Sequence, residues 1–160
     1  MGIRLSEADE GVHAVGEVPN WNESRYLDFW DPAQRLGGWF RIGNRVNEGH
    51  AEMSACLNLP DGRTAFFFER PQIAHSGLQA GGQSWEIFEP WRTNRVRYRG
   101  PVPLLDDPWT LTEPGTAFRA APRAPAEVDL ICRSTGLGTV MGSDQDHIDR
   151  SFLPGQADLH

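Results

Sequence analysis

Apolar and polar residues alternate with a period of two along most of this chain. In the clearest stretch, residues 50–59, every second position from Ala51 onward is apolar and most positions between are polar. This alternation predicts a strand with one buried face, because successive strand side chains point to opposite sides. The next run, residues 64–69, is apolar on both faces and predicts a central strand or a barrel wall. Asp61 and Gly62 between the two runs are typical of a tight hairpin turn.

The same pattern predicts an all-β fold for the whole chain. Two aromatic-rich segments, 21–32 and 37–45, are interpreted as strands joined by a turn. Further strands are predicted at 38–46, 84–88, 92–98, 109–112 and 127–132, with turn residues between several of them. No window carries a helical apolar stripe beyond a turn or two near 32–36. About eight short antiparallel strands with short turns predict a closed barrel or a β-sandwich.

Length and composition favour one domain with loose ends. The chain has 160 residues, 39% of them hydrophobic, and its 17 Gly and 12 Pro fall in short clusters between apolar runs. We predict a loosely ordered segment at 1–19, a β-domain at 20–135 and a flexible tail at 136–160. The sequence shows no membrane span and no secretory signal. Cys56 and Cys132 form no metal or redox motif, so we expect a cytoplasmic protein with free thiols, a single disulfide being the alternative.

The charge excludes several classes of function. The net charge is -7 and all 15 basic residues are arginines. Without lysine, Schiff-base chemistry, pyridoxal chemistry and a phosphate-loop lysine are excluded. The acidic balance also argues against nucleic acid as a partner, since such binders need excess positive charge.

One basic stripe runs against this acidic balance. In a strand over 92–98 and just beyond, Arg95, Arg97 and Arg99 share one face. Such a stripe could bind RNA or an anionic ligand. A solvated face paired with carboxylates such as Glu86 or Glu69 is the interpretation that the overall charge favours.

Sequence motifs give no support for a cofactor or a metal. The glycine-rich run 136–142 lacks the spacing, helix and second strand of a dinucleotide site. The acidic run 144–149 lacks the central Gly and terminal Glu of a calcium loop. The five histidines never recur at ligand spacing, and no nucleophile elbow occurs. We therefore expect no metal and no cofactor.

A polar set embedded in the aromatic strands supplies the catalytic candidates, Glu23, Glu52 and Arg41. If one of these carboxyls faced an apolar barrel interior, desolvation would raise its pKa and suit it to general acid catalysis. The alternative is that Glu23 and Arg41 form a structural ion pair on neighbouring strands while Arg45 faces water.

Four short motifs in this order resemble a known family. They are Trp21-Asn22-Glu23-Ser24, Gly37-Gly38-Trp39-Phe40-Arg41, Asn47-Glu48-Gly49 and Pro60-Asp61-Gly62. Over about residues 19–99 the chain resembles the N-terminal half of the lipocalin-like carotenoid hydratase (hydroxyneurosporene synthase-like) family. That resemblance implies a lipocalin-like β-domain, which in the family is followed by a second one. It also implies cofactor-free addition of water to an isolated alkene, with roles for Trp21, Asn22, Glu23, Arg41 and Asn47.

The sequence and the resemblance together predict a domain that binds an apolar isoprenoid-, steroid- or lipid-like small molecule. Hydratase or isomerase activity on that ligand is left open, as is binding without any chemistry. The predicted ligand-binding residues are Trp21, Asn22, Trp39, Asn44, Arg45, Phe66 and Phe68. The alternative function is a non-catalytic structural half that pairs with a second lipocalin-like domain or, as a homodimer, with itself.

Overall fold

The computed structural model describes residues 6–133 and contains eight strands within them. In chain order the elements are η1 (Glu7–Glu10), β1 (Glu23–Asp31), β2 (Leu36–Arg45), η2 (Val46–Glu48), β3 (His50–Asn58), β4 (Thr64–Glu69), β5 (Gln79–Ala80), β6 (Gln83–Glu89), β7 (Thr93–Leu105), η3 (Pro108–Thr112), α1 (Pro114–Ala120) and β8 (Arg123–Arg133). The η elements are short 3-10 helices.

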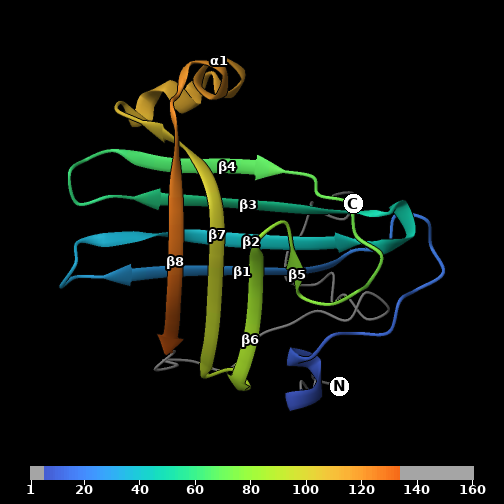
Figure 1. Cartoon of the computed structure of the whole chain (residues 1–160). Helices are drawn as coiled ribbons and strands as arrows, with labels where there is room; N and C mark the ends of the chain where they lie inside the picture. The colour runs from blue at the N-terminus through green and yellow to red at the C-terminus, as the bar shows by residue number, and fades with distance from the viewer. Residues whose placement is uncertain (1–5, 134–160) are drawn as a thin grey trace, which may run out of the picture.

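The strands form two layers that cross one another. β1 to β4 make a first layer in sequence order, and β5 to β8 make a second layer that runs across it (Figure 1). All neighbouring strands are antiparallel. The layers join where β4 pairs with the end of β7, at Thr64 with Leu105 and Ala65 with Leu104.

The hydrophobic core fills the space between the layers. It is built from residues of β2, β3 and β4 on one side and β7 on the other: Phe40, Met53, Ala55, Leu57, Ala65, Phe67, Val96, Tyr98 and Val102. Phe67 and Tyr98 stack across the two layers with ring centroids 4.5 Å apart. The alternating positions of β2 and β3 therefore have one inner face, toward this core, and one outer face.

The predicted antiparallel all-β fold is confirmed, and of its two forms the structure shows the sandwich. β1 and β5 are the ends of the strand path, and no pairing within residues 6–133 joins them, so the sheet is not closed into a barrel. The hairpin predicted at Asp61 and Gly62 connects β3 to β4, with Gly62 at φ +88°. A left-handed backbone of this kind favours glycine.

The strand predicted at 109–112 is wrong. These residues lie in η3, which Pro108 begins and Asp107 caps by accepting a hydrogen bond from the Trp109 N–H at 3.0 Å. Proline fixes φ near the helical value, and an aspartate before it satisfies a free N–H, so this turn chemistry outweighs the apolar residues. The seven-residue helix α1 was also not predicted, because it is too short to carry a helical stripe.

The arginine stripe of β7 is a paired, solvated face as predicted. Arg97 donates to Glu86 of β6 at 2.9 Å, and Arg95 pairs with Asp129 of β8. Glu69, the other partner considered, lies instead 3.3 Å from Arg123. These pairs balance the charges of Arg95 and Arg97 with carboxylates of the neighbouring strands, while Arg99 is exposed.

Several predicted features lie outside the described residues. They are the tail at 136–160, the glycine-rich run at 136–142 and the acidic run at 144–149. Of the predicted N-terminal segment, residues 6–19 are described and contain η1. Cys56 and Cys132 are both free thiols, so the alternative of a disulfide is wrong.

Candidate functional site

Most of the predicted site residues lie on the outer face of the first layer. On β2, Trp39, Arg41 and Arg45 point away from the core, since Phe40, Ile42 and Asn44 point into it. Register then fixes the neighbours on adjacent strands: Arg41 lies between Tyr26 of β1 and Ser54 of β3. We call this surface the aromatic–arginine face. Its residues are Asn22, Tyr26, Trp39, Arg41, Arg45, Glu52, Phe66, Phe68 and Arg70.

Aromatic rings run across this face from β1 to α1. Tyr26 contacts Trp39 with ring centroids 5.7 Å apart, and Trp39 meets Phe66 edge to face at 5.9 Å. Phe66 stacks in turn on Phe118 of α1 at 5.1 Å. The side chain of Cys56 lies between Trp39 and Phe66 in register and is small, which allows these two rings to meet across β3. Four rings therefore form one continuous apolar strip.

Three arginines surround the single carboxylate of Glu52 beside this strip. Arg70 Nη2 donates to Glu52 Oε1 at 2.8 Å. Arg41 Nη1 and Arg45 Nε each lie 3.6 Å from Glu52 Oε2, which is longer than a good hydrogen bond. Arg70 also lies over the Phe68 ring, 5.4 Å from its centroid, so a further aromatic ring borders the charged cluster.

The environment of Glu52 opposes the predicted role of a neutral acid. Burial raises the pKa of this carboxyl, but the hydrogen bond from Arg70 and the charges of Arg45 and Arg41 lower it, and the net pKa lies below its ordinary value. Glu52 is therefore a carboxylate at neutral pH. Glu52 thus does not meet the condition of the prediction, an apolar barrel interior, because it lies on the outer face among three guanidinium groups.

This lowered pKa predicts a pH-dependent contribution to stability. Replacing Glu52 with glutamine should lower the free energy of unfolding by about 1–2 kcal/mol at pH 7, since three arginines lose their counter-charge. A lowered folded pKa gives stability that is complete above the unfolded value of about 4.3 and is lost as pH falls through the folded pKa. Urea unfolding in steps from pH 7 to pH 3 should show the two proteins converging. Glu86→Gln, which removes one exposed pair, should cost less than about 1 kcal/mol; an equal cost would contradict the prediction.

Gly43 leaves room next to Arg41 on the same face. A Cβ atom built at this position would lie 2.8 Å from Asn22 Oδ1 and 3.3 Å from Arg41 Nη2. Asn22 and the Arg41 guanidinium therefore both lie over the glycine. Asn22, predicted as a ligand contact, is in this way brought into the arginine cluster.

Glu23 lies on the opposite, inner face of the first layer. It is only 7% exposed, and both its oxygens lie near His13 Nδ1, the shorter contact being 2.9 Å. The predicted alternative of an ion pair with Arg41 is wrong. In the β1–β2 register Glu23 is opposite Asn44, so it shares the face of Asn44 and not that of Arg41.

Two further predicted ligand contacts also lie away from the aromatic–arginine face. Asn44 is completely buried and donates its amide to the Gly77 carbonyl, while its Oδ1 has no hydrogen-bond partner in the part of the chain that the structure describes. Trp21 precedes β1, and its indole lies against Gly16. The hydrogen bond from Asn44 to Gly77 holds the loop before β5 against β2.

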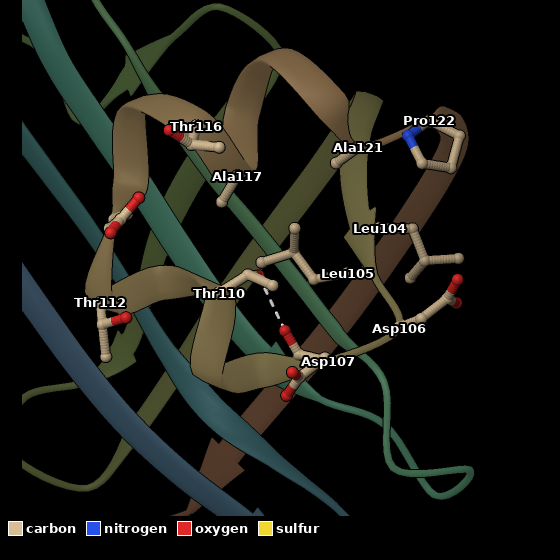
Figure 2. A pocket seen from close by; sticks show the side chains of 11 residues that line it. Leu104, Leu105, Asp106, Asp107, Thr110, Thr112, Thr116, Ala117, Ala121 and Pro122 are labelled. Carbon is tan, nitrogen blue, oxygen red and sulfur yellow. Dashed lines mark hydrogen bonds between the residues drawn. The ribbon is translucent and has the colours of Figure 1, made fainter.

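A separate cavity lies between the end of β7, η3 and α1. Its volume is about 380 Å³, and Leu104, Leu105, Ala117 and Pro122 line its apolar side. Figure 2 shows the hydroxyls of Thr110, Thr112 and Thr116 and the carboxylates of Asp106 and Asp107 around the same space. None of the ten predicted site residues lines it.

Two members of the face, Tyr26 and Arg70, and its neighbour Phe118 were not predicted from the sequence. Tyr26 was available from the alternation of the first strand, once Trp39 was placed on the outer face. Arg70 follows β4, and Phe118 belongs to the unpredicted helix, so only the folded arrangement brings them to Glu52 and Phe66.

Comparisons with known proteins give a family but no activity. Within residues 6–133 no three metal-ligating side chains cluster, and no helix there has the length and apolar character to cross a bilayer. No curated protein and no solved structure matches the chain. The resemblance to carotenoid hydratases stays a prediction. A family model described as a domain of unknown function (DUF7064) matches residues 6–151, so the chain belongs to that family.

Proposed function

We propose that this chain is a binding domain for an apolar isoprenoid-, steroid- or lipid-like small molecule. The proposed binding surface is the aromatic–arginine face, in place of the barrel interior that the sequence suggested. The observation that carries the proposal is that seven of the ten predicted site residues lie together on this one face.

Exposure and packing both favour this face over the interior. Tyr26 is 55% exposed and Phe68 is 47% exposed, although large apolar side chains usually lie in the core. Between the layers, by contrast, Phe40, Ile42 and Val96 are completely buried against other side chains. An apolar ligand on the outer face would cover rings that otherwise contact water, which is favourable.

The same geometry favours binding over hydration or isomerisation. Protonation of an isolated alkene needs a neutral carboxylic acid next to the double bond. Glu52, the carboxyl on this face, is a carboxylate among arginines, and Glu23 is on the inner face. Activity of the kind that the family resemblance implies would therefore need Glu23 and a ligand on the other side of β1.

Removing the central ring should weaken binding of an apolar probe. Isothermal titration of the full chain with farnesol should give a dissociation constant at least about tenfold higher for Trp39→Ala, since burial of one aromatic side chain is worth about 1.5–3 kcal/mol. Trp109→Ala is the matched control, because Trp109 is 80% exposed in η3 and stacks on none of the four rings of the strip. Equal affinities of the two variants, each folded by circular dichroism, would place the binding surface elsewhere.

Pairing with a second β-domain or a second copy is the other candidate function. It is favoured by the exposure of Tyr26, which belongs to the continuous strip of rings on this sheet face, since exposed apolar patches often mark interfaces. Native mass spectrometry separates the two candidates. A dimer that Phe68→Asp dissociates supports pairing, whereas a monomer that carries an apolar adduct supports ligand binding.

A further inference from the structure

The aromatic–arginine face holds a cluster of three arginines. Arg41, Arg45 and Arg70 surround Glu52, and Arg45 has a second contact to Glu48 at 3.4 Å. Three guanidinium groups thus share two carboxylates, while a further carboxylate of this face, Asp28, accepts from the Tyr26 hydroxyl at 2.8 Å. This clustering of arginines occurs in a chain whose net charge is -7, so it is not an average property of the surface.

The hydrogen-bond donors of the cluster are also incompletely used. A guanidinium has five N–H donors. Within residues 6–133, the side chain of Arg41 donates no hydrogen bond and has only its 3.6 Å contact to Glu52. Arg45 Nε is buried and lacks a hydrogen-bond partner among the same residues. The unused donors of Arg41, whose side chain is 31% exposed, are suited to a carboxylate, which guanidinium groups bind in bidentate fashion.

Space and apolar surface lie next to these donors. Along its own strand Arg41 is flanked by Gly43 on one side and by Trp39 on the other. Across the sheet its neighbours are Ser54, which is small, and Tyr26, whose ring contacts Trp39. The guanidinium therefore stands at the boundary between the charged cluster and the strip of aromatic rings.

We propose that this face binds an amphipathic monocarboxylate, with the carboxylate head on Arg41 and Arg45 and the apolar body along Tyr26, Trp39 and Phe66. The proposal rests on the function proposed above and specifies the class of its ligand. The guanidinium of Arg41 donates no other hydrogen bond among residues 6–133, and its two parallel N–H groups match the two oxygens of one carboxylate.

A matched pair of probes tests the head group separately from the apolar body. Farnesoate and farnesol share one chain and differ only in the carboxylate. Isothermal titration of the full chain should give a dissociation constant about tenfold lower for farnesoate, as expected for hydrogen bonds to a charged group. In Arg41→Gln the ratio of the two affinities should fall to about one. Arg97→Gln, which removes one positive charge from the second layer, should keep the wild-type ratio.

A second measurement needs no variant. Raising sodium chloride from 50 mM to 500 mM should reduce the preference for farnesoate and affect farnesol much less, because salt screens charge interactions at a partly exposed site. This result is expected whether or not Arg41→Gln folds well.

The outcomes separate the two proposals. If neither probe binds, the proposed function fails and this inference fails with it. If both probes bind wild-type protein equally, only the carboxylate inference is overturned. If Arg41→Gln and Arg97→Gln lost the preference for farnesoate over farnesol equally, the carboxylate inference would also be overturned. Such a result would show that the total charge of the protein attracts farnesoate. Tighter binding to phosphatidylglycerol vesicles than to farnesoate would replace the small molecule with a membrane surface.

Discussion

Replacing Phe40 with alanine is expected to cost about 3–5 kcal/mol of the free energy of unfolding. Phe40 is completely buried on the inner face of β2 and stacks on Phe29 of β1, with ring centroids 6.2 Å apart. It belongs to the core that joins the two layers, so its removal leaves a cavity that the neighbouring strands cannot easily close. Urea unfolding at pH 7 measures the loss as a lower midpoint with an unchanged slope.

Phe68→Ala is the matched control, since it removes the same side chain from the outer face. Phe68 is 47% exposed and packs under Arg70, so we expect a cost below about 1 kcal/mol. The comparison also decides between two kinds of binding domain. If Phe40→Ala cost no more than Phe68→Ala, the space between the layers would be loosely filled, and an internal ligand chamber would again be possible.

The strands could be predicted from the sequence because each has one face exposed to solvent. In β3 the alternation from Ala51 onward gave both the strand and its inner residues, and the structure confirms Ala51, Met53 and Ala55 in the core. The crossing of the two layers was not predictable, because it depends on where β7 leaves its partners to pair with β4 at Leu104 and Leu105. Local periodicity carries no information about such a long-range pairing.

The sequence predicted most residues of the candidate site, but it did not predict the ionisation of its acidic residue. Trp39, Arg41 and Arg45 lie on one face, and this much follows from the sequence, since strand parity depends on residue number alone. Which face is inner could not be known, because a shift of one residue exchanges the two. The sequence therefore suggested an interior acid, whereas the structure places Glu52 outside.

Electrostatics was the least predictable part of the site. The pKa of Glu52 depends on Arg70, which is 18 residues away in sequence and reaches it only through the pairing of β3 with β4. Similarly, the sequence offered no sign that Glu23 would meet His13, because His13 lies in a segment without periodic structure. Burial can be estimated from a strand pattern, but partner charges need the fold.

Glu10→Gln is expected to destabilise the chain by about 3 kcal/mol, although it changes one residue in a segment that the sequence marks as loose. Glu10 is buried and accepts from Arg25 Nη1 at 2.6 Å and from the Trp91 backbone N–H at 3.2 Å. Arg25 also donates to the Gly11 carbonyl at 3.0 Å. One carboxylate thus holds the N-terminal segment against β1 and the β6–β7 turn together.

The expected loss of stability is large because Glu10→Gln leaves the positive charge of Arg25 without its partner. Without the carboxylate, Arg25 keeps its charge at a position only 16% exposed, where water can solvate it poorly. The double variant Glu10→Gln/Arg25→Leu removes that charge and should recover much of the loss in urea unfolding. Glu7→Gln, in the same short helix but exposed, should change stability by less than about 0.5 kcal/mol. If Glu10→Gln and Arg25→Leu instead gave additive losses, the two side chains would not be coupled, and the N-terminal segment would be held by other contacts.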